Sequence, residues 1–141
     1  MLSVSTIKSA SKAGGYYTAE DNYYFLGEQA TGWYGTGAES LGLEGLVSRE
    51  MFTDILEGRL PDGTDLTRME GDVNRHRPGY DLTFSAPKSV SVLALVTGVR
   101  YLVEAHNRAV ERTLDEVEKL ATTRTMQDGV SGMERTGNLV I

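Results

Sequence analysis

Two pairs of adjacent tyrosines are the side chains of this sequence most suited to chemistry. Tyr16-Tyr17 and Tyr23-Tyr24 hold four of the seven tyrosines and are spaced seven residues apart. This spacing is close to two helical turns, so the pairs could lie along one side of a helix. A phenol oxygen can attack phosphorus and form a phosphotyrosine bond, although a free pKa of about 10 requires help from a base or a metal. The rings could instead stack on unpaired bases or pack as amphipathic core and rim residues.

The residues around the tyrosines predict how they are held. Gly14-Gly15 allows a sharp entry and the close approach of another backbone. Thr18 is suited to cap the N-terminus of a helix. We therefore expect residues 8–15 to form a loop or a single turn, and a helix to run from Thr18 to about Gly27. Tyr16-Tyr17 would then lie just before that helix.

A second stretch, residues 76–91, is also dense in functional residue types. Residues 80–85 alternate apolar and polar side chains, which predicts a strand with Asp81 on its polar face. Lys88 follows Pro87 in the first turn of an expected helix, where free backbone N–H groups favour anions. A solvated acid and a surface lysine explain the same pattern equally well.

Length and composition exclude several classes of protein. A chain of 141 residues with 40% hydrophobic and 24% charged residues is typical of one globular domain and not of a disordered segment. The absence of cysteine excludes disulfides and thiolate metal sites. The longest apolar run, residues 92–96, is too short to span a bilayer, and the first residues lack a signal-peptide pattern.

The charge of the chain limits how it could bind nucleic acid. A net charge of −6 disfavours a surface that is basic throughout, so DNA contacts would use local cations. The candidates are Lys8, Lys12, Arg75, Arg77 and Lys88.

The remaining patterns predict an α+β fold. Strands are expected at residues 2–7, around Trp33-Tyr34, and at residues 80–85, 122–126 and 137–141, the last two joined through Gln127-Asp128-Gly129; helices are expected at residues 48–57, 87–97 and 99–121; and residues 60–63 and 65–79 are expected to form a turn and an exposed connection. Strands and helices do not alternate strictly, which favours an antiparallel or mixed sheet covered by helices. His106 lies on the apolar stripe of the longest helix and is expected to be a core or rim residue.

These motifs resemble the N-terminal relaxase domain of the MobF conjugative relaxases, the TraI and TrwC type of the HUH superfamily. The likeness runs from Met1 to Ile141 and includes residues 14–24, 60–63, 76–91, 105–107 and 136–140. It implies an antiparallel five-stranded sheet with helices packed against it, incomplete here at the C-terminus. Residues 1–141 would be the N-terminal portion of the DNA-nicking domain, with no second domain.

The resemblance also implies a site- and strand-specific DNA transesterase. Such an enzyme initiates conjugative transfer at a plasmid transfer origin through a 5′-phosphotyrosine intermediate. By family position Tyr16 would be the main nucleophile, with Tyr17 beside it and Tyr23 and Tyr24 as the second pair. Asp81 matches an acid that supports the metal-binding histidines of the family. The family partners are single-stranded DNA and relaxosome accessory proteins, in the bacterial cytoplasm.

The family uses a divalent metal, Mg or Mn, held by three histidines that follow the strand corresponding to Leu139-Val140-Ile141. The two histidines of this sequence, His76 and His106, match none of those positions. We therefore expect this stretch alone to bind no metal and to nick no DNA. An uncovered strand edge would favour self-association. A non-catalytic module that binds single-stranded DNA by tyrosine stacking, and a purely structural α/β domain, remain alternatives.

Overall fold

The structure is a computed structural model that describes residues 1–17 and 32–141, in two compact units. The tyrosine unit consists of Val4–Trp33 and Glu39–Leu82. The long-helix unit consists of Met1–Ser3, Tyr34–Ala38 and Thr83–Ile141. The expected helix from Thr18, with Tyr23 and Tyr24, lies outside the described residues.

Helices α1 (Ala10–Tyr17) and α3 (Arg49–Glu57) pack together in the tyrosine unit. Helix α3 confirms the prediction made from its capping residues. The Ser48 side chain accepts a hydrogen bond from the Met51 N–H at 3.2 Å, and Gly58 ends the helix at a φ of 91°. The two helices meet around buried Ala10, Ala13 and Leu56, against which Ile7, Tyr17 and Phe52 pack.

Helix α1 corrects the expectation of a loop or single turn before the first tyrosine pair. It begins after Ser9, whose carbonyl accepts from the Ala13 N–H at 3.1 Å and whose hydroxyl accepts from the Lys12 N–H at 3.4 Å. Gly14 and Gly15 lie inside the helix, where each glycine costs about 1 kcal/mol relative to alanine. Packing against α3 must offset that cost. The first tyrosine pair therefore lies within a helix instead of in the loop that was expected before the second element.

A short hairpin follows α3 in the tyrosine unit. Strands β2 (Met69–Glu70) and β3 (Val73–Asn74) form a short antiparallel hairpin where an exposed connection was expected. The predicted turn at residues 60–63 is confirmed, because the Gly63 N–H donates to the Leu60 carbonyl at 3.1 Å.

Strands β1 (Leu2–Ile7) and β4 (Gly79–Phe84) confirm two further predictions and pair in a two-stranded sheet. Beside them Met1 and Ser85 exchange both backbone hydrogen bonds, the pattern of an antiparallel pair. Burial along β4 does not follow the predicted alternation, since Tyr80 is 57% exposed whereas Asp81 is half-buried.

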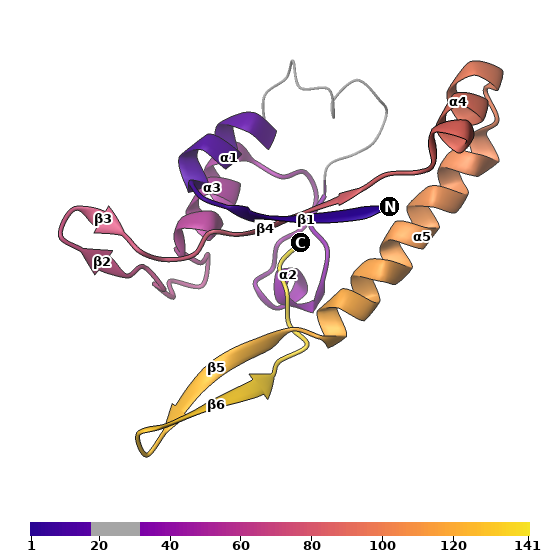
Figure 1. Cartoon of the computed structure of the whole chain (residues 1–141). Helices are drawn as coiled ribbons and strands as arrows, with labels where there is room; N and C mark the ends of the chain where they lie inside the picture. The colour runs from indigo at the N-terminus through magenta and orange to yellow at the C-terminus, as the bar shows by residue number, and fades with distance from the viewer. Residues whose placement is uncertain (18–31) are drawn as a thin grey trace. The chain divides into compact units, whose positions relative to one another are not determined.

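The long-helix unit is built on α4 (Lys88–Thr97) and α5 (Arg100–Lys119), which Figure 1 shows leading into a hairpin of β5 (Thr122–Gln127) and β6 (Val130–Arg135). Both helices confirm the sequence prediction. Gly98 separates them with a φ of 67°. The half-buried positions of α5 recur every three or four residues: Leu102, Val103, His106, Val110, Thr113, Leu114, Val117 and Glu118.

The hairpin corrects the expected pairing of the C-terminal strands. β5 pairs with residues 130–135 and not with residues 137–141. Asp128 and Gly129 alone make the turn, both with positive φ (51° and 79°), as a type I′ turn requires. This tighter turn fixes the register Thr122↔Arg135 to Gln127↔Val130.

Residues 137–141 lie instead beside residues 34–37. Tyr34 and Ile141 exchange both backbone hydrogen bonds, at 2.7 and 2.9 Å, and the Gly37 N–H donates to the Leu139 carbonyl at 2.9 Å. A Cβ on Gly37 would lie 2.5 Å from that carbonyl oxygen, so this approach needs glycine. The predicted short strand at Trp33-Tyr34 is replaced by this pair and by the helix α2 (Thr36–Ser40).

The elements together give the α+β class that the sequence predicts. The strands of the described residues form three separate two-stranded sheets. Buried apolar side chains in this part of the chain are few: Ala10, Ala13, Ala38, Leu43 and Leu56. No helix within residues 1–17 and 32–141 has both the length and the apolar character needed to cross a bilayer.

Candidate functional site

The first tyrosine pair forms a defined structure at the end of α1. Tyr16 is 58% exposed, while Tyr17 is half-buried. Their ring centroids lie 5.1 Å apart with planes at 83°, an edge-to-face contact. The Tyr17 ring meets Phe52 of α3 in the same way, at 6.2 Å and 86°. The pair thus combines an accessible phenol with a neighbouring ring that packs on the core.

Close packing of α1 on α3 sets the position of this pair. A Cβ on Gly14 would lie only 2.2 Å from the Thr53 Oγ1, so the helices approach closely only because residue 14 is glycine. The Thr53 hydroxyl donates to the Arg49 carbonyl at 2.8 Å, which holds its side chain in place. The glycines predicted to form an entry turn therefore serve as a helix contact.

Trp33 extends the line of aromatic rings. It is half-buried and lies 6.4 Å from Phe52, with ring planes at 49°. We call Tyr16, Tyr17, Phe52 and Trp33 the aromatic row. The helical period of residues 48–57 predicts that Phe52 lies on the apolar face of α3, but no local pattern in the sequence joins Phe52 to the tyrosines. An aromatic row with one accessible end could also stack on unpaired bases.

Asp81 lies in the middle of β4, as predicted, but it is half-buried. A half-buried carboxylate is costly unless it has polar partners. Asp81 is therefore not a fully solvated surface acid. The strand position is therefore confirmed, whereas a catalytic role for Asp81 stays a prediction.

The predicted DNA-binding cations are divided between the two units. In the tyrosine unit, Arg75 pairs with Glu70 at 2.8 Å and Arg77 donates to the Tyr80 hydroxyl at 2.9 Å. Both members of the Arg75–Glu70 pair are exposed, and such pairs stabilise little, so a phosphate could replace the carboxylate. Lys88 is the first residue of α4 in the long-helix unit.

Lys8 lines a polar cavity of about 480 Å³ in the tyrosine unit, together with Ser9 at the start of α1 and His76. Arg59, also on its wall, pairs with Asp54 at 2.6 Å and Glu57 at 2.5 Å. Hydrogen bonds from the Thr67 side chain and backbone lower the pKa of Asp65, so this wall also carries a carboxylate. Charges of both signs mean that the cavity does not select an anion by itself.

A hydrogen-bonded cluster in the long-helix unit fixes the last residues of the chain. The Glu118 carboxylate accepts from the Thr36 N–H at 2.8 Å, the Thr36 hydroxyl at 2.9 Å and the Leu139 N–H at 3.1 Å. Partial burial raises the pKa of Glu118, but these hydrogen bonds outweigh it and hold the pKa below its usual 4.5. Glu118 therefore joins three segments as a carboxylate.

Tyr34 is a tyrosine of a different kind. Its hydroxyl donates to an Asp115 carboxylate oxygen at 2.5 Å, and this bond, with nearby carboxylates, raises the pKa of Tyr34 to about 12. A phenol that donates to a carboxylate stays protonated near neutrality. Its role is structural, unlike that proposed for the pair on α1.

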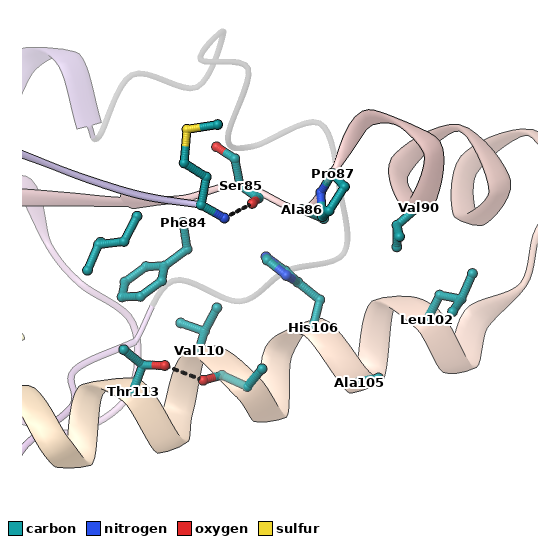
Figure 2. A pocket seen from close by; sticks show the side chains of 13 residues that line it. Phe84, Ser85, Ala86, Pro87, Val90, Leu102, Ala105, His106, Val110 and Thr113 are labelled. Carbon is teal, nitrogen blue, oxygen red and sulfur yellow. Dashed lines mark hydrogen bonds between the residues drawn. The ribbon is translucent and has the colours of Figure 1, made fainter.

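His106 lines an apolar cavity of about 450 Å³ in the long-helix unit. Figure 2 shows it projecting from α5 among Phe84, Val110 and Leu102. Its half-buried position confirms the prediction of a rim residue. His76 belongs to the tyrosine unit. Within the described ranges, no three His, Cys, Asp or Glu side chains gather in a way that could hold a metal ion.

Comparisons with known proteins agree with the resemblance seen in the sequence. The family model of the TrwC relaxase matches residues 10–141. The multifunctional conjugation protein TraI of Escherichia coli is 58% identical over all 141 residues, which make up 8% of its length. The conjugative relaxase TrwC, solved metal-free with oriT DNA, matches 99% of this chain with a TM-score of 0.80 and 41% identity. A metal-bound TrwC structure with oriT DNA matches with a TM-score of 0.79 and 42% identity, and 48% of either TrwC chain is covered.

Proposed function

We propose, because this chain belongs to the TrwC relaxase family, that it is the tyrosine-bearing part of a DNA relaxase that starts conjugative plasmid transfer. It would cut one strand at a transfer origin by transesterification. The Tyr16 phenol oxygen forms a bond to phosphorus as the bond from phosphorus to the 3′ oxygen breaks. The electron pair leaves with the 3′ oxygen, which ends as a hydroxyl with the proton that the phenol gives up. The DNA then stays linked to the protein through its 5′ phosphate.

The observation that carries this proposal is that the Tyr16 phenol is accessible while its ring is in contact with Tyr17. The side chain is 58% exposed, yet its ring packs edge-on against Tyr17 at 5.1 Å. A nucleophile must reach a phosphate while its orientation is restricted, because alignment of the reacting atoms accounts for much of catalysis.

The other predicted residues take supporting roles in the proposal. Tyr17 lies beside the nucleophile, and Tyr23 and Tyr24 form the second pair, outside the described residues. Asp81 would orient metal-binding groups supplied by the longer protein. The described residues do not form a metal site by themselves. Lys8, Arg75, Arg77 and Lys88 would contact the DNA backbone, which carries most of the affinity.

The chain spans 8% of the curated relative and about half of the solved TrwC chain, so the complete activity is proposed for the longer protein. Residues 1–141 would be the N-terminal portion of its nicking domain. The Mg or Mn ion of the family, and relaxosome accessory proteins, would join it in the bacterial cytoplasm.

Covalent trapping tests the proposal. The full-length protein that carries this chain is incubated with a single-stranded transfer-origin oligonucleotide and Mg²⁺ or Mn²⁺, and adducts are separated on a denaturing gel. We expect Tyr16→Phe to form no adduct and to bind the oligonucleotide as before. Tyr101→Phe, which changes a 64% exposed tyrosine on α5, is the matched control and should react normally. Adduct formation at the wild-type rate by Tyr16→Phe would refute the assignment.

A second candidate function rests on the aromatic row. Four rings that contact one another in series, one of them exposed, could hold single-stranded DNA by stacking without any chemistry, at about 1–3 kcal/mol per stacked base. The same gel separates the two functions, because only the relaxase leaves a covalent product.

A further inference from the structure

We propose that Phe52 is a positioning residue for the relaxase reaction, acting on Tyr16 through the ring of Tyr17. The inference deepens the proposed function and rests on it. It assigns different tasks to the two neighbouring tyrosines. Tyr16 attacks the phosphate, and the Tyr17 ring, which contacts Phe52 of α3, restricts the orientation of Tyr16.

The two ring contacts run in series and have the same geometry. Phe52 meets Tyr17 at 6.2 Å and 86°, and Tyr17 meets Tyr16 at 5.1 Å and 83°. Edge-to-face contacts depend on ring orientation, since the positive edge of one ring points to the negative face of the next. A rotation of the Tyr17 ring would therefore weaken both contacts together.

Phe52 can serve as the fixed end of this series because α3 is anchored. It lies one turn after the Ser48 cap and packs on the core of Ala10, Ala13 and Leu56. Its ring also lies 6.4 Å from that of Trp33. Tyr16, in contrast, lies in the last turn of α1 and is mostly exposed. The packed α3 therefore restricts the orientation of the exposed Tyr16 phenol.

The arrangement explains how one of two adjacent phenols would be favoured. Tyr17 is half-buried and its ring contacts both Phe52 and Tyr16, so a large reorientation of this side chain would break both contacts. If Phe52 loses its ring, Tyr17 loses one of the contacts that orient its ring, and the orientation of Tyr16 becomes less restricted. The reaction should then become slower and less selective between the two tyrosines.

Replacement of the ring by an aliphatic side chain of similar bulk is the direct test. In the full-length protein with a transfer-origin oligonucleotide, Phe52→Leu should lower the cleavage rate at saturating DNA by about 2- to 10-fold, the range expected for one edge-to-face contact. Peptide mapping of the adduct should show a larger share on Tyr17. Phe52→Tyr keeps the ring and should restore both the rate and the Tyr16 preference.

A matched control separates positioning from loss of stability. Ile55→Ala removes a half-buried side chain from the same helix but no ring, so it should lower the unfolding temperature and leave the adduct distribution unchanged. A wild-type rate and distribution in Phe52→Leu, or the same redistribution in Ile55→Ala, would overturn the inference alone. A wild-type protein that forms no adduct on any tyrosine would overturn the proposed function, and the inference with it.

Discussion

Gly14→Ala tests whether the close approach of α1 to α3 determines the stability of the tyrosine unit. The new Cβ would lie 2.2 Å from the Thr53 Oγ1, whereas ordinary contacts begin at 3.4 Å. Either the helices separate or the Thr53 side chain rotates and loses its 2.8 Å bond to the Arg49 carbonyl. Overpacking of this kind costs about 1–3 kcal/mol, and alanine recovers about 1 kcal/mol of helix propensity. The free energy of unfolding should therefore fall by up to about 2 kcal/mol.

Thermal and urea unfolding of single and double variants measure this effect. The unfolding temperature of Gly14→Ala should drop by up to roughly 8 °C for a chain of this size. In a Thr53→Ala background the obstructing oxygen is absent, so the same change should be neutral or stabilise by up to about 1 kcal/mol. Gly15→Ala is the matched control, because its Cβ would meet only the flexible end of Arg49 at 3.4 Å. Equal costs for Gly14→Ala in both backgrounds would refute the steric reasoning.

Two further predictions concern the carboxylates. In the full-length protein, Asp81→Asn should lower cleavage by about 10–100-fold, as changes beside metal ligands do, while a drop in stability without loss of cleavage would contradict the proposed role. Glu118→Gln should reduce the free energy of unfolding by about 1 kcal/mol, because a neutral amide oxygen accepts the hydrogen bonds from Thr36 and Leu139 more weakly than the charged carboxylate oxygen does. The folded-state pKa of Glu118 is lowered, so its stabilisation is present above about pH 4.5 and is lost as the pH falls through the folded pKa. Urea unfolding across this pH range should therefore show a shallower acid loss in Glu118→Gln than in the wild type.

The elements that the sequence predicted well are those specified by local signals. Helix α3 has a serine cap at one end and a glycine at the other, and α5 has a long apolar period. The elements that it missed depend on distant contacts. Helix α1 contains two glycines, a poor helix signal, and Gly14 is explained only by Thr53 across the interface. The pairing of Tyr34 with Ile141 likewise joins segments that no local pattern connects.

The candidate site shows the same division. Residue types and the family resemblance identified Tyr16 and Tyr17, and the structure adds their edge-to-face contact. Phe52 was predicted only as an apolar residue of α3, because a helical period indicates which face is buried and not which ring it meets. The half-burial of Asp81 was missed because strand alternation assigns one face to solvent without knowledge of what covers it. The self-association expected from an open strand edge stays a prediction.

The pairing of residues 34–38 with the end of the chain has a consequence for synthesis on the ribosome. Residues of the tyrosine unit have all been made once Leu82 has emerged, so that unit can form early. The segment around Thr36 must wait for Gly137, its partner 101 residues later. Domains form as their residues become available during translation, and closing so long a loop costs chain entropy. Folding of the nascent chain would thus be sequential, with α1 and α3 already paired before α5 and the last residues enclose residues 34–38. A ribosome stalled before residue 137 should present a protected α1–α3 pair and an unprotected Tyr34–Ala38 segment to a protease.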